Sequence, residues 1–328
     1  MPAARTAIAC FGEALVDFLA DPAAAEGRLF AANPGGAPAN VAVGVARLGG
    51  DARFIGMLAE DLFGARLDAA LRAHGVDVAH VRRTAEAPTA LAFVSLDAGG
   101  ERSFAFYRPP AADLLFSVAH YDDAAFAGLA VFHACSNSLT GEPAATATLH
   151  GLARARRAGA IASVDLNLRP ALWPPGIDPR TALWRALAEA QLVKLSREEL
   201  EFLGAGCGGD AAVLARLFGG ATRVVVATDG AAPIRWWTPA RAGTAPTFAV
   251  AARDTTAAGD AFVAGLLQRL VARAIGAGGL SAAFDDDAVR DDLLRHAAAC
   301  GALATTRHGA FDAMPDAAAV DALLERGR

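Results

Sequence analysis

Lysine is almost absent from this sequence of 328 residues, which contains a single one, Lys194. A P-loop of the type G-x-x-x-x-G-K-[ST] needs a lysine, and no such motif is present, so a P-loop NTPase is excluded. No G-x-G-x-x-G follows the first expected strand, which weakens a dinucleotide-binding interpretation. The sequence also lacks G-x-S-x-G and H-E-x-x-H, so it carries neither an α/β-hydrolase nucleophile nor that zinc-binding motif.

Cysteine and positive charge are also scarce. Four cysteines, Cys10, Cys135, Cys207 and Cys300, lie far apart with no C-x-x-C spacing, which fits buried thiols in a reducing cytosol better than disulfides or a zinc site. The formal net charge of −5 leaves no basic surplus for nucleic acid. The first apolar stretch is too short for a signal peptide, and no segment approaches the roughly eighteen apolar residues of a membrane span. We therefore expect a cytoplasmic protein that binds neither nucleic acid nor membrane.

Short apolar runs alternate with alanine-rich helical segments along most of the chain. Strands are expected at residues 8–11, 53–57, 129–134, 161–165, 192–195 and 223–227. Helices are expected at residues 40–48, 62–74, 144–158, 180–190, 210–218 and 291–305, and from about residue 259. Near-continuous apolar strands separated by crossover helices are typical of a mainly parallel sheet with helices on both faces. The sequence therefore predicts an α/β fold, with residues 1–328 forming one domain.

Two stretches interrupt this rhythm. Residues 88–96 and 102–107 are strand-like and are joined by Asp97-Ala98-Gly99-Gly100, a natural hairpin turn. Residues 16–33 also lack helical periodicity. Because an antiparallel hairpin does not join a parallel sheet easily, we expect about 17–34 and 88–112 to form a small β-sheet that acts as a lid over a cleft. A decorative insertion is the alternative.

The most informative stretch is Asp254-Thr255-Thr256-Ala257-Ala258-Gly259-Asp260, at the start of an expected helix. Small residues before a helix let backbone N–H groups approach an anion, and the helix dipole adds to the attraction. A carboxylate in the first turn, Asp260, would take a proton from a hydroxyl while the adjacent amides hold a transferring phosphoryl group. The alternative is that Asp254 or Thr256 caps the helix and that Asp260 complements its dipole.

A second glycine-containing stretch lies near the other end of the chain, in Asn33-Pro34-Gly35-Gly36-Ala37-Pro38-Ala39-Asn40. Gly35 and Gly36 would bring backbone against a polyhydroxylated ligand, and Asn40 offers both a donor and an acceptor. Taken alone, the stretch is also compatible with an ordinary turn into a helix. Asp17, just after the first strand, adds a polar group at the carboxyl edge of the sheet, where open α/β sheets bind ligands.

With these two stretches the sequence resembles the ribokinase-like, or PfkB, carbohydrate kinases, and within that family most of all the bacterial and plant fructokinases. Intermediate landmarks occur in order over essentially the whole chain, at residues 12–17, 104–108, 165–169, 194–199 and 300–303. The resemblance implies a ribokinase-like three-layer αβα fold with a β-sheet lid. It also implies an ATP-dependent kinase that transfers the γ-phosphoryl group to a primary hydroxyl of a sugar.

The same resemblance implies roles for individual residues. Asp260 would be the general base, with the amides of Ala257, Ala258 and Gly259 as the anion hole. Sugar-binding positions would be Asp17, Gly35, Gly36, Asn40, Phe106, Arg108 and Arg169. Nucleotide-binding positions would be Lys194, Thr228, Gly230, Gly259, Ala298 and Gly301. Two of these regions depart from the family pattern, since Pro233 stands in place of a glycine and Ala298 in place of an asparagine.

Two metal ions are implied as well. Glu199 matches the acidic end of the N-x-x-E motif, which would bind Mg²⁺ through water, although Ser196 replaces its asparagine. A K⁺ ion is expected in many members of the family. Its matching positions here would be Asp254 and the carbonyl groups of Ala304, Arg307 and Gly309.

The substrate is left open between related sugars. Arg108 and Arg169 would bind a carboxylate, as in a 2-keto-3-deoxygluconate kinase, or hydroxyl groups of fructose; surface or core-edge ion pairs are the alternative. We expect fructose, converted to fructose 6-phosphate, with a sugar-acid kinase or ribokinase as the alternative. A non-catalytic sugar-sensing protein of the same fold is the alternative from a different class. The exposed lid hairpin also predicts a homodimer.

Overall fold

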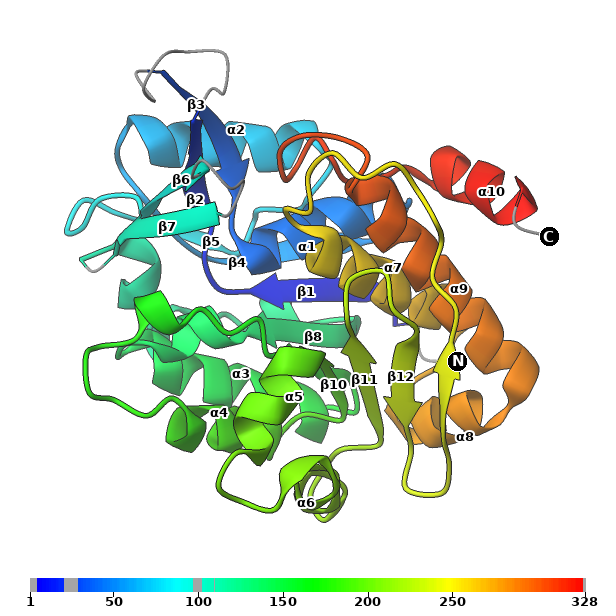
Figure 1. The fold of residues 1–328 in the computed structure, drawn as a ribbon. Helices are drawn as coiled ribbons and strands as arrows, with labels where there is room; N and C mark the ends of the chain where they lie inside the picture. Colours follow the sequence, from blue (N-terminus) through cyan, green and yellow to red (C-terminus); the bar gives the residue numbers. More distant parts are fainter. Residues whose placement is uncertain (1–4, 21–28, 97–101, 109, 327–328) are drawn as a thin grey trace.

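The computed structural model describes residues 5–20, 29–96, 102–108 and 110–326 (Figure 1). A nine-stranded sheet runs through the molecule in the order β13-β12-β11-β10-β9-β8-β1-β4-β5. Its strands pair in parallel except for β12 and β13, which are antiparallel. The strands are β1 (Ala7–Phe11), β4 (Ala52–Ala59), β5 (Val81–Thr84), β8 (Leu129–Cys135), β9 (Ile161–Asp165), β10 (Leu192–Ser196), β11 (Val224–Thr228), β12 (Ile234–Trp237) and β13 (Ala242–Ala245).

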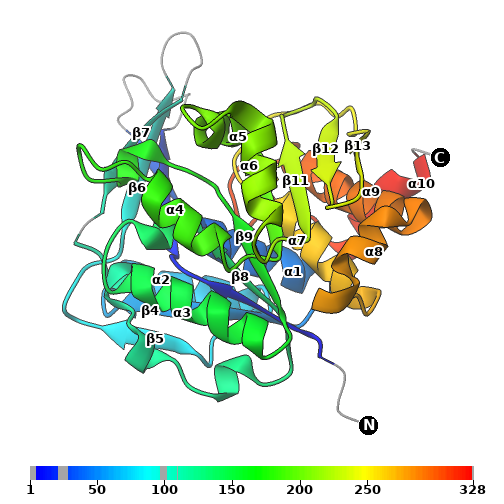
Figure 2. The same cartoon turned by 90° about the horizontal axis from the view of Figure 1, so that it is seen from below.

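Helices cover both faces of this sheet (Figures 1 and 2). One face carries α1 (Ala37–Arg47), α2 (Leu62–Ala73), α7 (Ala258–Ala272), α8 (Leu280–Asp285) and α9 (Asp287–Ala304), with α10 (Ala317–Arg326) against α9. The other face carries α3 (Ala144–Arg157), α4 (Arg180–Leu187), α5 (Arg197–Gly204) and α6 (Gly209–Phe218).

Successive residues of the buried strands enter opposite cores. In β1, Ile8 and Cys10 pack toward α1 and α7, whereas Ala9 and Phe11 pack toward α3. A strand buried on both faces has no polar side, and this is why these strands read as continuous apolar runs. The expected α/β fold with three layers is confirmed.

The accessory sheet has four strands in the order β3-β2-β6-β7. They are β2 (Leu15–Ala20), β3 (Phe30–Gly35), β6 (Leu91–Leu96) and β7 (Arg102–Tyr107). The expected pairing of β6 with β7 is antiparallel, and β2 joins β6 in parallel. The turn expected at residues 97–100 lies outside the described residues, as do residues 21–28 and 109 of the expected lid.

Several elements differ from the sequence expectations. Helix α1 begins at Ala37 with Pro38 in its first turn, so Asn40 lies inside the helix and not before it. Proline suits this position because the first N–H groups of a helix have no partner within it. Helix α4 ends at Leu187, and α9 begins at Asp287, where the side chain of Asp286 accepts from the backbone of Val289. The strands β5, β12 and β13 and the helices α5, α8 and α10 were not expected, whereas β2 and β3 fall largely in the stretch 17–34 that was expected to form part of the small sheet.

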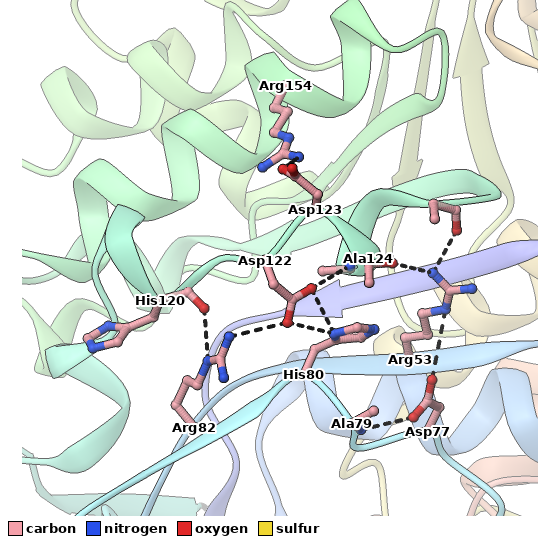
Figure 3. A network of polar contacts seen from close by, with 12 residues as sticks. Arg53, Asp77, Ala79, His80, Arg82, His120, Asp122, Asp123, Ala124 and Arg154 are labelled. Atoms are coloured by element: carbon pink, nitrogen blue, oxygen red, sulfur yellow. Dashed lines mark hydrogen bonds and ion pairs between the residues drawn. The ribbon is translucent and has the colours of Figure 1, made fainter.

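Figure 3 shows a polar network at the β5 edge of the large sheet. The carboxylate of Asp122 accepts from His80 and from Arg82, each at 3.2 Å, and Arg82 also donates to the carbonyl of His120 at 2.9 Å. Nearby, Arg53 donates to the carbonyl of Ala127 at 2.8 Å. These side chains tie β4 and β5 to the short helical turns that precede β8, and none of them lines the pocket described below. Their role is therefore structural.

Within the described ranges, no single helix is long and apolar enough to cross a membrane. Helix α7 and the segment Ala277–Asp285 reach the length and apolar composition of a membrane span only when taken together, and the chain bends by 99° between them.

Candidate active site

The N-terminus of α7 lines the same cavity as the accessory sheet and is formed by the small residues that the sequence singled out. Ala257 has a φ of 57°, in the left-handed region, and stands at the N-cap position. No side chain caps this helix; the carboxylate of Asp254 instead accepts from the backbone N–H of Thr256 at 2.8 Å. The interpretation of Asp254 or Thr256 as a cap is therefore wrong. An uncapped helix start built from Ala257, Ala258 and Gly259 is suited to binding an anion.

The buried carboxylate of Asp260 lies in the first turn of this helix and is bound by two side-chain amides. Asn40 in α1 donates to Oδ2 at 2.7 Å, and Asn167, just after β9, donates to Oδ1 at 3.0 Å. Burial raises the pKa of Asp260, while the bonds from the two amides and the charges of Lys194 and Arg169 act in the opposite direction. Two hydrogen bonds to the charged form keep a buried carboxylate available as a base.

A cavity of about 430 Å³ extends from Asp260 to the accessory sheet. All of the expected sugar-binding residues except Gly35 line it, and Gly35 lies directly behind Asp17. The lining is Glu13, Leu15, Asp17, Leu19, Gly36, Ala37, Asn40, Phe106, Arg108, Asn137, Asn167, Arg169, Leu172, Thr255, Thr256, Ala257 and Asp260. A cavity of this size accommodates a small molecule.

Both glycines of the N-terminal stretch are required by close contacts. A Cβ atom on Gly35 would lie 2.2 Å from Oδ2 of Asp17. Gly36 has a φ of 104°, and a Cβ atom there would lie 2.6 Å from the carbonyl oxygen of Glu13. The absence of side chains thus lets β3 lie against the Asp17 carboxylate and the turn after β1.

Asp17 is the second carboxylate of the cavity. Burial, together with the negative charge of Asp260, raises the pKa of Asp17 to about 7, against the opposing effect of Arg169. A carboxyl group with a pKa near neutrality can bind hydroxyl groups as donor or acceptor.

Arg108 is already paired inside the protein. Its side chain is buried and binds the Asp113 carboxylate through both Nε (2.9 Å) and Nη2, and its Nη1 donates to the carbonyl of Asn137 at 3.0 Å. Arg108 therefore forms a buried ion pair and also lines the cavity, so its expected role in sugar binding stays a prediction. Arg169 lines the cavity as well, and its charge acts on both Asp17 and Asp260.

Outside the run from Asp254 to Asp260, three polar residues of the cavity were not assigned a role from the sequence. Asn167 binds the base, as described above. Glu13 is buried, and its Oε1 accepts from the backbone of Ala37 at 3.2 Å and from the Asn137 side chain at 2.9 Å. Glu13 and Asn167 belong to the ordered landmarks of the family pattern, but their spacing in the sequence does not show that they face the cavity. Asn137, in the turn after β8, has no local signal.

Three of the expected nucleotide-binding residues, Lys194, Gly259 and Gly301, meet at the N-terminus of α7. Lys194 in β10 pairs with Asp165 at 2.9 Å, and its Nζ lies 3.0 Å from where a Cβ of Gly259 would be. A Cβ atom on Gly301 in α9 would likewise lie 3.2 Å from the carbonyl oxygen of Ala258. Thr228 ends β11 and Gly230 follows it with a φ of 52°, while Ala298 is buried in α9.

The sole lysine is buried among carboxylates. Burial alone would lower the pKa of Lys194, but Asp165 and Glu199 outweigh this effect and raise it. The ammonium group of Lys194 thus stays protonated and lies beside the N-terminus of α7, where an anion would bind.

The residues expected at the two metal sites have defined partners. Oε1 of Glu199 accepts from the backbone of Leu168 and its Oε2 from that of Ser196, each at 2.7 Å, so that Glu199 and Ser196 form a capping box for α5. Asp254 is held against the loop after α9, because its Oδ2 accepts from Gly309 at 3.2 Å and the backbone N–H of Asp254 donates to the carbonyl of Thr305. The carbonyl of Ala304 in this loop accepts from the backbone of Arg307 at 3.3 Å.

An ionisable base, an uncapped helix start and a cavity lined by hydrogen-bonding groups meet at the carboxyl edge of the parallel sheet. Such a site holds a hydroxyl group against a transferring phosphoryl group, and together with this fold it defines a kinase that acts on a small polyhydroxylated molecule.

The comparison with known proteins places this kinase in a family. The chain belongs to the pfkB family of carbohydrate kinases, whose model matches residues 5–317. It is 41% identical to fructokinase-1 of Zea mays over 99% of this chain and 100% of the maize protein. The structure of a fructokinase from Xylella fastidiosa with bound ATP is similar with a TM-score of 0.95 and 49% identity, covering 98% of this chain and 99% of that one.

A fructokinase from Vibrio cholerae is also similar. The form with fructose, ADP and calcium has a TM-score of 0.85 and 33% identity, covering 98% of this chain and 99% of that one. A double mutant of the same enzyme contains fructose, ADP and a potassium ion; it has a TM-score of 0.86 and 33% identity, covering 99% of this chain and 100% of that one.

Proposed function

We propose that the protein is an ATP-dependent fructokinase that converts fructose and ATP to fructose 6-phosphate and ADP. The observation that carries the proposal is the 2.7 Å contact of Asn40 with Asp260, which joins the two motif-bearing stretches of the chain at one cavity. The maize relative and the Xylella and Vibrio structures support fructose and ATP as the substrates.

The chemistry follows from the positions of the groups. Asp260 takes the proton of the primary hydroxyl as its oxygen attacks the γ-phosphorus. The new O–P bond forms while the bond from phosphorus to the β,γ-bridging oxygen breaks, and the electron pair leaves with ADP. The amides of Ala257 to Gly259 and the charge of Lys194 stabilise the negative charge on the transferring group.

The charge of the cavity favours a neutral sugar over a sugar acid. Three carboxyl groups line it, those of Glu13, Asp17 and Asp260, and the charge of Arg108 is largely compensated by Asp113. A substrate carboxylate would therefore meet net negative charge and would have only Arg169 as a cationic partner. We therefore propose fructose, and not 2-keto-3-deoxygluconate, as the preferred substrate.

Mg²⁺ is the expected partner of ATP. In the described parts of the chain, no group of three His, Cys, Asp or Glu side chains is arranged to hold a metal ion. This fits Mg²⁺, which retains waters and takes ligands from the nucleotide phosphates. Each oxygen of Glu199 accepts one backbone N–H and keeps lone pairs for such a water. Bound Mg²⁺ would neutralise charge on the phosphates.

A K⁺ site is part of the same proposal. Asp254 and the loop of Ala304, Arg307 and Gly309 lie together behind the anion hole, where carbonyl and carboxylate oxygens are the available ligands. The potassium-containing Vibrio structure supports the choice of ion for a protein of this family.

We also propose that the accessory sheet acts as a lid and as the contact of a homodimer. Its side toward the cavity carries Leu15, Asp17 and Phe106. Its other side carries Phe18 stacked on Phe93, with the exposed Phe30 and Tyr107 at the edges of that ring cluster. Exposed aromatic side chains next to unpaired strand edges favour pairing with a second copy.

The test is a coupled assay of ADP formation with fructose, ribose, 2-keto-3-deoxygluconate and adenosine as acceptors. We expect the highest kcat/KM with fructose. Preference for the keto acid would overturn the choice of sugar, and the absence of turnover with every acceptor would leave a non-catalytic sugar-binding protein.

A further inference from the structure

Asn167 contacts the base from the loop after β9, although nothing in the sequence assigned it a role. Its Nδ2 donates to Oδ1 of Asp260 at 3.0 Å, while Asn40 donates to Oδ2 at 2.7 Å. All three side chains are buried. A carboxylate only accepts hydrogen bonds, so both amides must present their NH₂ groups to it. One lone pair on each oxygen of Asp260 is thereby occupied.

The backbone of Asn167 is held in an unfavourable conformation. Its φ of 39° is in the left-handed region, which costs a non-glycine residue on the order of 1–2 kcal/mol. Contacts on both sides fix it there. Ser136 donates to the carbonyl of Asn167 at 3.3 Å, and the next backbone N–H, that of Leu168, donates to Glu199 at 2.7 Å. The strained backbone directs the amide toward the base.

The charge environment of the base is mixed. Cations act on Asp260 from Lys194 in β10 and from Arg169 after β9. The ionisable groups that face it from β2, β9 and β8 are those of Asp17, Asp165 and Cys135. The thiol of Cys135 is neutral because burial raises its pKa well above the usual value. Since burial and the carboxyl groups of Asp17 and Asp165 oppose the ionisation of Asp260, the two amide donors matter for its charge state as well as for its orientation.

We infer that Asn167 is a positioning residue, whose amide acts together with that of Asn40 to hold the Asp260 carboxylate ionised and turned toward the substrate hydroxyl. This inference rests on the proposed kinase activity. It extends that proposal, because it assigns to a second asparagine a role in catalysis that does not involve contact with the sugar.

Two variants separate the hydrogen bond from the backbone conformation. Asn167→Gly accepts the positive φ and removes the donor. Asn167→Asp keeps the size of the side chain and tolerates the same backbone, but replaces a donor by a second carboxylate about 3 Å from the base. Ala274→Gly is the matched control, since Ala274 also has a positive φ, of 55°, at the far end of α7.

The measurement is the pH dependence of kcat and of KM for the sugar, with thermal unfolding to verify the fold of each variant. For Asn167→Gly we expect kcat near pH 7 to fall by about 10- to 100-fold, with KM changed much less, because a displaced base loses its geometry. The acidic limb of the profile should move to higher pH. Asn167→Asp should move it further, and Ala274→Gly should leave both quantities unchanged.

Two results would overturn the inference. A folded Asn167→Gly enzyme with kcat within about twofold of wild type and an unmoved acidic limb shows that the bond has no catalytic role. A rise in KM alone shows that Asn167 binds the sugar instead. Should the glycine variant fail to fold, Asn167→Asp gives the same readout with a side chain of native size. Wild-type turnover is measured first, so failure of the kinase proposal is recognised separately.

Discussion

Asn40 and Asp260 are 220 positions apart in the sequence, and the side-chain amide of the first donates a 2.7 Å hydrogen bond to the carboxylate of the second. Asn40 belongs to the glycine-containing stretch that runs into the first turn of α1, and Asp260 to the uncapped start of α7. The contact brings the sugar-binding side of the cavity against the base, and the first prediction concerns that base.

Asp260→Asn should abolish most of the activity while preserving the fold. The amide has nearly the same size but cannot take the proton of the hydroxyl, so we expect kcat to fall by about 10²- to 10⁴-fold. Sugar affinity, measured by calorimetry, should change much less. Turnover close to that of the wild type would mean that another group is the base.

Gly35→Ala should weaken sugar binding. The added methyl would lie 2.2 Å from Oδ2 of Asp17, so the carboxylate must move away from the position it holds in the cavity. We expect KM for fructose to rise by tenfold or more, about 1.4 kcal/mol or more in binding, measured by steady-state kinetics. Gly276→Ala is the control, because a Cβ there meets nothing within 4 Å. Equal KM values for both variants would contradict the assignment of Asp17.

The stability of the sugar-free protein should depend on the titration of Asp17. Its pKa is raised to about 7 in the folded state, whereas a carboxyl in the unfolded chain titrates near about 3.9. Between these values the folded state binds more protons, so this group makes the free energy of unfolding decrease as the pH rises from about 4 to about 7. Above the folded-state pKa of Asp17, the full decrease in the free energy of unfolding caused by its ionisation is present.

Asp17→Asn removes this contribution. Urea unfolding from pH 4 to pH 8 should show a shallower decrease for the variant, which should also be more stable than wild type at pH 8. A residual slope is expected from Glu13, since burial raises the pKa of that carboxyl in the same direction. Parallel curves for variant and wild type would show that Asp17 is ionised throughout.

Arg108→Met should destabilise the protein, because it leaves the buried carboxylate of Asp113 without its cation. Removal of one partner of a buried ion pair costs about 3–5 kcal/mol. Asp113→Asn in the same chain should restore part of the loss, since it removes the unpaired charge. Urea unfolding of the single and double variants gives the comparison. If the single variant is as stable as wild type but loses sugar affinity, Arg108 is a sugar-binding group and not a structural one.

Tyr107→Glu should disrupt the proposed homodimer. The side chain is 66% exposed on the outer side of the accessory sheet, and a charge there would have to be buried on dimerisation. Light scattering at micromolar concentration should give a dimer for wild type and a monomer for the variant. Ile177→Glu, at a residue that is 56% exposed and is not part of this sheet, is the control. A monomeric wild type at that concentration rules the dimer out.

Much of the fold was predictable because its signals are local. The buried strands β1, β8, β9, β10 and β11 are near-continuous apolar runs, and the small residues Ala257 to Gly259 followed by an apolar segment indicate the start of α7. A small sheet was expected to include residues 17–34, but the individual strands β2 and β3 were not predicted, because Asp17, Asn33 and Pro34 interrupt any apolar alternation. These strands exist through pairing with each other and with β6, which is not a local property.

The sequence by itself determined the parallel sheet, the anion-binding helix start and the candidate base, because each depends on residue type and spacing over a few turns. Only the tertiary structure decided what the polar side chains do. Arg108 pairs with Asp113, and Glu13 lines the cavity. Asn167, whose backbone φ is positive, donates a hydrogen bond to Asp260. Each of these facts depends on packing between layers. The sequence specifies the charge of a side chain, whereas the tertiary structure determines which group it pairs with.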